Sequence, residues 1–456
     1  MAGIGFALKK LSDREDIIGL FAAGFFSAFI ACGPWLFTVV ALSFIMVFGL
    51  QVVSAVELQE FQIILVYNFS FSYVFFGFFG LVVTRYISDR IYDKNYHAVS
   101  DVFFGSLSLG LISGLIIISC FYLFVAKMTL PEAVSAIINF IVLTSIWHAS
   151  IFLTVLKEYK TVSTTFLFSL FSSVFISLYL GYEFKILGLL NGFTIGLCII
   201  LAVLYSTFLS NFQYRIESPF KFLKYFGSKW QLLLSGIFCN SGIWVDKWLM
   251  WFSPNSFVNK LNLTCDLDYS NAMFIASLTV VPSLAFFLFG TETLLDKEIL
   301  NLFASIREKA SYQQITFIHK KMITSIFNNL LLFIIIQGAI SFLSIISSYK
   351  ILEFLNIPLI QVDIFSFGVL GAFYQIFTFY LVMMLYYFDR LNSVLIIYAV
   401  FFILNASLTS LSIHMGFNYY GTGFFMASLL TFLFAGIITV IHLHKLIYHI
   451  FITNNS

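Results

Sequence analysis

Long apolar segments follow one another along the whole chain and are separated by short polar ones. A helix needs about 20 mostly apolar residues to cross a hydrocarbon core about 30 Å thick, and each apolar segment reaches that length. The segments are continuous rather than alternating, which argues against the strands of a membrane β-barrel. The pattern predicts about twelve transmembrane helices, near residues 17–49, 61–84, 101–126, 132–156, 161–182, 185–209, 230–253, 268–291, 322–348, 359–387, 391–414 and 421–445.

A polar, basic segment at residues 210–229 separates the first six predicted helices from the last six. Two such groups are typical of secondary transporters built from repeats, in which the substrate cavity lies between the halves. We therefore expect an all-α integral membrane protein with an N-terminal six-helix bundle at 1–209, a cytoplasmic linker at 210–229 and a C-terminal six-helix bundle at 230–456.

The basic residues are divided unevenly between the two sides of the predicted membrane. Nearly all of the 24 Lys and Arg residues fall in the loops of one side, in a pattern that alternates loop by loop. The exceptions are four residues on the other side and one within the seventh helix, namely Lys127, Lys185, Lys260, Lys350 and Lys247. Because cytoplasmic loops carry the excess of Lys and Arg, both termini are predicted to lie in the cytoplasm.

Composition narrows the class of protein further. With 60% hydrophobic and 10% charged residues and a mean hydropathy of +0.98, the chain has too little polar surface for a soluble domain. The five cysteines show no CxxC spacing, so neither a disulfide framework nor a metal site is expected. The chain also lacks a phosphate-binding Gly-rich loop, a dinucleotide fingerprint and a GxSxG elbow. We therefore expect no enzymatic activity, no cofactor and no nucleic-acid partner.

The first predicted helix contains Gly33, Pro34 and Trp35 near the middle of the membrane. Proline removes a backbone donor and clashes with the preceding turn, so the helix should kink here. The segment is either a structural kink or a gating bend that lines a wet cavity. Residues 242–246 of the seventh helix lie at a similar depth, and matched breaks in the two halves of a transporter point to a central site.

The seventh predicted helix carries Asp246 and Lys247, with Trp244 close by. A charge at the bilayer centre costs about 2.5–3.5 kcal/mol on insertion scales, so it usually faces the protein interior and is often functional. Adjacent residues on a helix do not face each other, so spacing alone does not predict an ion pair. The alternative is that these residues belong to an aromatic belt at the outer membrane interface.

Further polar residues occur inside the predicted spans. Tyr67 and Asn68 lie in the second helix and Asn240 lies in the seventh. They either line a hydrophilic path for a substrate or form hydrogen bonds between helices, which is the commoner use of such residues.

Residues 291–321 form the longest predicted cytoplasmic segment. Glu292 ends the eighth helix, and Leu295 and Leu302 belong to an apolar stripe at helical spacing. Arg307 and Lys309 occupy other positions. This pattern predicts an amphipathic helix lying on the inner face of the membrane, in contact with lipid. The alternative is a docking surface for a cytoplasmic partner.

Several short motifs occur in the same order along the chain as in one known family. They are Met1–Phe6, Gly33–Trp35, Gly242–Lys247, Glu292–Thr293, Tyr387–Arg390 and Tyr419–Phe424. The set resembles the PelG family, the inner-membrane transporters of Pel exopolysaccharide systems. The family belongs to the polysaccharide branch of the MOP flippase superfamily (multidrug, oligosaccharidyl-lipid and polysaccharide transporters).

The resemblance implies export of a nascent, amino-sugar-rich exopolysaccharide across the bacterial inner membrane. It also implies a complex with a cytoplasmic glycosyltransferase and with other membrane subunits of a Pel-like synthase. Two alternatives remain open. One is an ion-coupled multidrug antiporter of the same superfamily, in which Asp246 is the only plausible titrating carboxylate. The other is a scaffold that holds a glycosyltransferase at the membrane without transporting anything.

Overall fold

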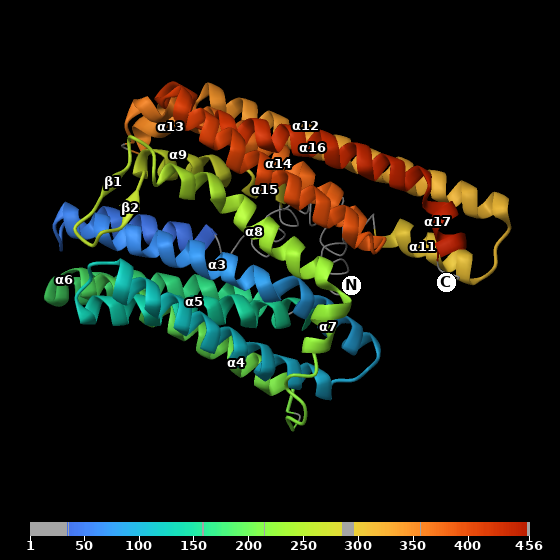
Figure 1. Ribbon diagram of the computed structural model, residues 1–456, viewed down its shortest axis with the longest axis horizontal. Helices are drawn as coiled ribbons and strands as arrows, with labels where there is room; N and C mark the ends of the chain where they lie inside the picture. Colours follow the sequence, from blue (N-terminus) through green and yellow to red (C-terminus); the bar gives the residue numbers. More distant parts are fainter. Residues whose placement is uncertain are drawn as a thin grey trace, which may run out of the picture. The chain divides into compact units, whose positions relative to one another are not determined.

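The computed structural model of the protein consists almost entirely of helices (Figure 1). The helices form two compact units, of which the first ends at Asp266 and the second begins at Leu267. The structure describes residues 34, 36–156, 159–213, 215–284, 296–355 and 357–453.

The first unit begins with an apolar helix at Leu36–Gly49. The helices that follow pack against one another, with α5 lying against α3, α4 and α6 (Figure 1). The elements that follow the first helix in this unit, including a small hairpin of β1 and β2, are α3 (Ala55–Tyr92), α4 (His97–Cys120), the π-helix η1 (Phe121–Val125), α5 (Leu130–Leu156), α6 (Tyr159–Asn211), α7 (Leu223–Ser228), α8 (Trp230–Met250), β1 (Phe257–Val258) and β2 (Thr264–Cys265).

The element α6 is in fact two helices joined by a tight turn at Lys185, whose φ is 56°. Small residues allow the two arms to pack closely, because a Cβ added to Gly192 would lie 2.4 Å from the Cα of Ser177. Glycine is the residue that permits such a close approach of two backbones in a membrane protein. The two arms correspond to the predicted spans 161–182 and 185–209.

Loops predicted to lie on the outer side of the membrane gather at one end of the first unit. The backbone N–H of Lys127 donates to the carbonyl of Leu261 at 2.9 Å. The Asn262 side-chain amide donates to the carbonyl of Val125 at 3.0 Å. These bonds fasten the β1–β2 hairpin over the end of η1.

The predicted cytoplasmic linker is fastened to the opposite end of the same unit. Asp101, near the start of α4, accepts from the backbone N–H of Glu217 at 2.8 Å. The hydroxyl of Tyr225 in α7 donates to the carboxylate of Asp89. Burial raises the pKa of Tyr225, and the hydrogen bond to Asp89 raises it further. The alternation of loops between the two ends agrees with the span order predicted from hydropathy.

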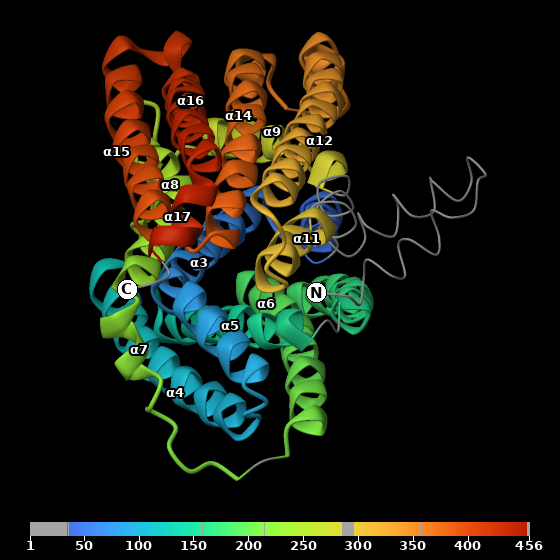
Figure 2. The ribbon, with the colours of Figure 1, turned by 90° about the vertical axis from the view of Figure 1, so that its right-hand side faces the viewer.

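The second unit is built around α14, which contacts α9, α12, α15 and α16. Figure 2 shows α12, α14, α15 and α16 side by side. Its elements are α9 (Leu267–Leu278), α11 (Asp296–Arg307), α12 (Tyr312–Ile346), α13 (Ser348–Phe354), the 3-10 helix η3 (Leu359–Gln361), α14 (Val362–Tyr387), α15 (Leu391–Met415), the 3-10 helix η4 (Phe417–Tyr419), α16 (Thr422–His444) and α17 (Leu446–Thr453).

The chain turns after α9 ends at Leu278 and then continues as a short helix. The fully buried Gln337 of α12 lies at this interruption. Its amide nitrogen is 3.5 Å from the carbonyl oxygen of Thr279 and donates to Ser341 Oγ at 3.1 Å, while its oxygen accepts from the hydroxyl of Ser283. An interrupted helix is tolerated at membrane depth only where the freed backbone groups are satisfied inside the protein.

Among the described residues, eight helices are long and apolar enough to cross a membrane, and one of these is the α6 hairpin. The polar residues of α8 lower its hydropathy, so it is not one of the eight. The helix at Leu36–Gly49 is the described part of the first predicted span. The predicted all-α membrane fold is confirmed. Contacts group α8 with the first unit, and the sequence division at 210–229 stays a prediction.

Candidate functional site

The helix α8, which carries most of the predicted site, packs closely against α3. The two helices touch at Gly77 and Gly236, where a Cβ on Gly236 would lie 2.2 Å from the carbonyl oxygen of Gly77. A Cβ on Gly77 would in turn lie 2.7 Å from the carbonyl oxygen of Gly236. The contact therefore brings backbone against backbone, as small residues allow in membrane helices.

Side-chain hydrogen bonds extend this contact along α8. The Asn240 amide donates to the carbonyl of Tyr73 at 2.7 Å, and the indole N–H of Trp248 donates to Ser70 Oγ at 2.6 Å. Asn240 is thus one of the groups that fix α8 on α3, although its side chain is only half-buried.

Asp246 and Lys247 form an ion pair within α8. The Lys247 ammonium lies 3.0 Å and 3.2 Å from the two Asp246 carboxylate oxygens and donates to the carbonyl of Ile243 at 3.1 Å. The Asp246 side chain is fully buried, and that of Lys247 is 17% exposed. Spacing alone did not predict this pair. It forms because the long Lys247 side chain folds back toward the preceding turn.

Three predicted residues lie on one side of α8, because Asn240, Trp244 and Lys247 are spaced four and three residues apart. All three are half-buried. The Lys247 ammonium lies 5.9 Å from the centroid of the Trp244 ring, a cation–π contact. An amide and an indole on one surface, beside the ion pair, can donate hydrogen bonds to hydroxyl groups and cover an apolar ring face.

Tyr67 is buried and does not line a hydrophilic path for a substrate in this structure. Its ring stacks on Trp251 with centroids 4.1 Å apart, and its hydroxyl donates to the carbonyl of Thr264 at 2.7 Å. In this position Tyr67 fastens the end of α8 and the β1–β2 hairpin to α3.

Asn68 belongs to a buried chain of hydrogen bonds that links α3, η1, α5 and α6. Its amide donates to Asn139 Oδ1 at 2.9 Å and its oxygen accepts from the Tyr122 hydroxyl at 2.8 Å. Asn139 in turn donates to Thr194 Oγ1 at 2.9 Å. Asn68 and Asn139 are both fully buried. The structure therefore favours the interpretation of Asn68 as a bond between helices over that of a path residue.

The matched helix breaks expected from the sequence are not present in the described residues. The helix α8 runs without interruption from Trp230 to Met250, so the expected break at 242–246 is wrong. Gly33 and Trp35 lie outside the described residues. Pro34 begins a described helical stretch, and its carbonyl accepts from the Thr38 hydroxyl at 2.8 Å.

The amphipathic segment forms a helix, α11 (Asp296–Arg307), and two residues of its apolar stripe are buried inside the protein. Leu302 is fully buried and Ile299 is 3% exposed, in a hairpin of α11 with α12. Contacts with α12 accompany the burial of this apolar stripe, and the position of α11 on the inner membrane face stays a prediction. Arg307 and Lys309 are exposed. Glu292 and Leu295 lie outside the described residues.

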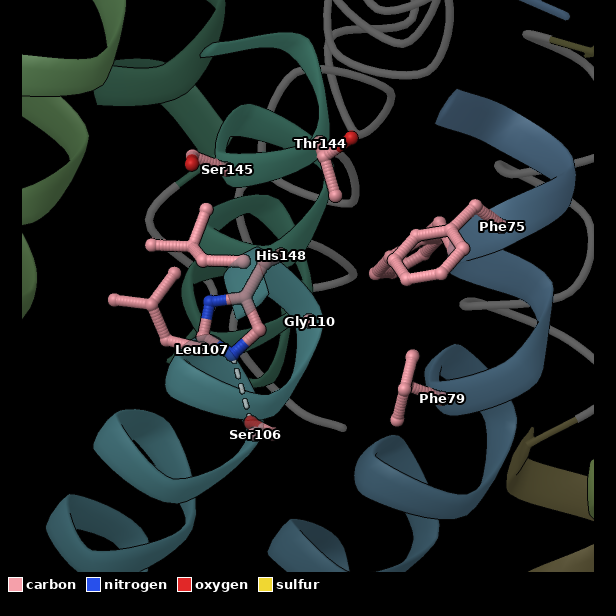
Figure 3. Close-up of a pocket in the computed structure, with 10 residues that line it drawn as sticks. Phe75, Phe79, Ser106, Leu107, Gly110, Thr144, Ser145 and His148 are labelled. Atoms are coloured by element: carbon pink, nitrogen blue, oxygen red, sulfur yellow. Dashed lines mark hydrogen bonds between the residues drawn. The ribbon is translucent and has the colours of Figure 1, made fainter. Parts of the chain in front are cut away.

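A small hollow in the first unit lies between α3, α4 and α5 (Figure 3). Phe75 and Phe79 form one wall, and His148 lies opposite, with its Nε2 2.7 Å from Ser106 Oγ. A Cβ added to the buried Gly110 would meet no atom within 4 Å, which confirms the free space. The residues of α8 that were predicted from the sequence do not line this hollow.

Sequence reasoning missed the residues that place α8. Gly77 and Gly236 are the contact point with α3, and Asn139 is the centre of the buried hydrogen-bond chain. Glycine or asparagine within an apolar span is a general signal for helix contact. The signal does not say which helix is the partner, so the pairs could not be derived.

This arrangement of helices is similar to that of solved transporters of the MOP superfamily. A MOP superfamily transporter from Pyrococcus furiosus is 12% identical, with a TM-score of 0.62 over 92% of this chain and 95% of the other. An outward-facing multidrug resistance MATE family transporter is 14% identical, with a TM-score of 0.60 over 98% and 99%. An inward-facing one is 12% identical, with a TM-score of 0.55 over 92% and 95%. The chain therefore has the fold of the MOP transporters.

The sequence model of PelG, described as an exopolysaccharide exporter (EPS-E), matches residues 1–451, and the chain belongs to this family. The resemblance found in the sequence motifs is thereby confirmed. None of the curated proteins matches the chain.

Proposed function

We propose that the protein exports a nascent, amino-sugar-rich exopolysaccharide across the bacterial inner membrane, and that the polymer passes along the half-buried side of α8. Membership of an exopolysaccharide exporter family over residues 1–451 is the observation that carries this proposal. In this account the protein moves the polymer without changing its covalent bonds.

The chemistry of α8 suits a sugar polymer. The indole of Trp244 offers a flat apolar surface to the C–H face of a sugar ring. The Asn240 amide has a second N–H beyond the one that it donates to Tyr73, and this N–H can bind a sugar hydroxyl group. Asp246 neutralises Lys247 from the buried side at 3.0 Å. The pair therefore presents polar groups without a net charge, so a long polymer can bind weakly at each position and move on.

Proton-coupled drug antiport on the same fold is the alternative function. An antiporter on this fold would need a carboxylate that gains and loses a proton within the membrane. Asp246 is already neutralised by the adjacent ammonium and is fully buried. In the proposed export path, Asp246 positions the Lys247 ammonium beside the polymer.

We further propose that both termini lie in the cytoplasm and that the protein works with a cytoplasmic glycosyltransferase and other membrane subunits of a Pel-like synthase. The excess of Lys and Arg on one side supports the orientation. An export path without a catalytic step needs a separate enzyme to build the polymer, which supports the partnership.

The test is secreted polysaccharide from cells that lack the gene and are complemented at matched protein levels. Wild type should restore secretion, and Asp246→Ala combined with Lys247→Ala should reduce it at least tenfold. If deletion leaves the export of every polymer unchanged, the proposed function is wrong. If both the wild type and the double variant secrete normally, the exporter proposal stands and only the path along α8 is wrong.

A further inference from the structure

The linker between the two groups of predicted helices folds back onto the first unit. The carboxylate of Asp101 accepts from the backbone N–H of Glu217 at 2.8 Å and from the hydroxyl of Ser218 at 3.1 Å. The next residue, Pro219, lies directly on α4, because a Cβ added to Gly105 would overlap its carbonyl oxygen. Figure 2 shows the linker passing beside α4 along the edge of the first unit. These contacts fix the position of the linker along α4.

This position places the linker at the membrane interface. Asp101 is the last charged residue before an uncharged run at 102–126 that is long enough to cross the hydrocarbon core. Gly105 lies four residues beyond Asp101, which is about 6 Å farther along the helix axis. The linker at Pro219 is therefore level with the boundary between the hydrocarbon core and the lipid headgroups.

One side of the linker faces the protein. Phe222 is 2% exposed, and the hydroxyl of Tyr225 donates to Asp89 in α3. The ring centroid of Phe226 lies 6.2 Å from that of Phe79, also in α3. Because Phe222, Tyr225 and Phe226 are three and four residues apart, they lie on the same side of α7 and the turn before it.

The opposite side is exposed and carries both apolar and basic residues. Phe220 and Lys224 are four residues apart and lie opposite Phe222, since a helix has about 3.6 residues per turn. Lys221 and Leu223 flank them. Phe220 is 49% exposed and Leu223 is 42% exposed, and both lysines are exposed. Within the described part of the chain, neither lysine forms an ion pair.

The linker has an excess of positive charge. Between residues 215 and 229 it contains one acidic residue, Glu217, and four basic ones, namely Arg215, Lys221, Lys224 and Lys229. The nearby carboxylates are already bound, Asp89 to Arg85 at 3.3 Å and Asp101 to the linker itself. Apolar side chains that enter the boundary between headgroups and acyl chains, together with lysines at the surface, are typical of segments that bind anionic lipid.

We propose that Phe220, Lys221, Leu223 and Lys224 form a binding surface for the anionic phospholipid headgroups of the adjoining membrane leaflet. Phe220 and Leu223 enter the boundary between headgroups and acyl chains, and the two ammonium groups bind headgroup phosphates. The bound lipid holds α7, and with it the start of α8, at the membrane surface. This inference goes beyond the proposed function and does not depend on the cargo or on the direction of transport.

Photo-crosslinking to lipid tests the surface directly. Full-length protein with a photoreactive phenylalanine at Phe220 is reconstituted in vesicles of three parts phosphatidylcholine to one part phosphatidylglycerol, and its lipid adducts are identified by mass spectrometry. The ratio of phosphatidylglycerol to phosphatidylcholine adducts should exceed that of the bilayer at least fivefold. The same group at Phe168, which is 70% exposed on α6, should capture the two lipids in proportion to the bilayer. Proportional capture at Phe220, or no lipid adduct there, overturns the proposal.

Substitutions test whether the lysines select the lipid. Lys221→Gln combined with Lys224→Gln should abolish the preference for phosphatidylglycerol at Phe220, while lipid adducts still form. Lys94→Gln combined with Lys309→Gln removes the same charge from two other exposed positions and should leave the preference unchanged. Equal loss in both double variants would assign the effect to net charge and contradict the proposed surface.

Thermal unfolding in detergent separates lipid from a free anion. Short-chain phosphatidylglycerol should raise the unfolding temperature of the wild type, because a ligand that binds only the folded protein stabilises it. The rise should be at least halved when Lys221→Gln and Lys224→Gln are combined. Inorganic phosphate at the same concentration should give no such rise, and an equal rise with phosphate would overturn the lipid proposal. Secretion enters none of these measurements, so this proposal and the proposed exporter function can fail separately.

Discussion

Lys247 and Asp246 act as one neutral unit on α8, and each makes the other tolerable at membrane depth. The Asp246 carboxylate is fully buried, with the Lys247 ammonium 3.0 Å away. Removing one partner of a buried pair leaves an uncompensated charge, whereas removing both restores neutrality.

The pair is therefore expected to show strong coupling in a double-mutant cycle. Lys247→Met alone should destabilise the protein by about 3–5 kcal/mol, since it strands a buried carboxylate. Asp246→Asn combined with Lys247→Met should be clearly more stable than Lys247→Met alone. Thermal unfolding in detergent micelles measures both. A double variant no more stable than the single one would mean that the two charges do not depend on each other.

Asn68 gives a second prediction, which separates a helix contact from a path residue. Asn68→Leu removes the hydrogen bonds to Asn139 and Tyr122 and leaves buried groups unpaired, which should cost about 1–3 kcal/mol. The amount of folded protein should fall, while polymer secreted per folded molecule stays at the wild-type level. Quantitative immunoblots with a secretion assay give that ratio. A fall in this ratio would indicate that Asn68 lines the path of the polymer.

At the residue scale the sequence predicts which groups are unusual, but not which groups they meet. Asp246, Lys247 and Asn240 stand out because polar residues are rare in apolar spans. The partners of such residues can lie far away in the chain, as Tyr73 does for Asn240 and Asn139 does for Asn68, and hydropathy carries no information about these pairs.

At the scale of elements, α8 is placed by the contact of two glycines. Because backbones touch at Gly77 and Gly236, even one added methyl group has no room there. Gly110 of α4 is also buried within a helix, but a Cβ there would meet no atom within 4 Å. Gly236 and Gly110 are therefore both helical glycines of the first unit, and they differ in whether a methyl group has room.

The prediction is that the same substitution has opposite effects at the two positions. Gly110→Ala should stabilise the protein by about 0.5–1 kcal/mol, because alanine has the better helix propensity and fits the hollow. Gly236→Ala should destabilise it by about 1–3 kcal/mol through overpacking. Unfolding temperatures of the two variants, compared with wild type, decide this. Equal effects would show that α8 does not touch α3 at Gly236.

Helix type and length follow from the sequence because twenty consecutive apolar residues have few other solutions. Helix shape does not follow. A glycine in a helix costs only about 1 kcal/mol, so Gly242 does not interrupt α8, and the predicted break there was wrong. The apolar side of α11 was predicted correctly as a stripe. Its partner, α12, could not be told from lipid because both are apolar.

For the whole molecule, the account rests on an alternating topology with an excess of positive charge inside. In the first unit the β1–β2 hairpin and η1 meet at one end, and the linker meets α4 at the other. The chain belongs to a family of exopolysaccharide exporters, and its fold is that of the MOP transporters. The orientation of the protein in the membrane is a prediction from the distribution of Lys and Arg alone.

Cysteine labelling at the two ends of the first unit checks that direction. Lys260→Cys, in the β1–β2 hairpin, should react with an impermeant maleimide in intact spheroplasts. Tyr92→Cys, at a position 89% exposed at the other end of α3, should react only after the membrane is opened. The opposite pattern would reverse the orientation and, with it, the direction of transport.

The central claim is that the exported polymer moves along α8, and capture of the polymer on this helix tests it most directly. A photoreactive side chain is placed at Trp244 in secreting cells, with the exposed position Phe168 of α6 as the control, which is 70% exposed. The account predicts covalent polymer on the Trp244 variant, at least tenfold above the Phe168 variant. Equal amounts at both positions, or none at Trp244 while secretion continues, would contradict it.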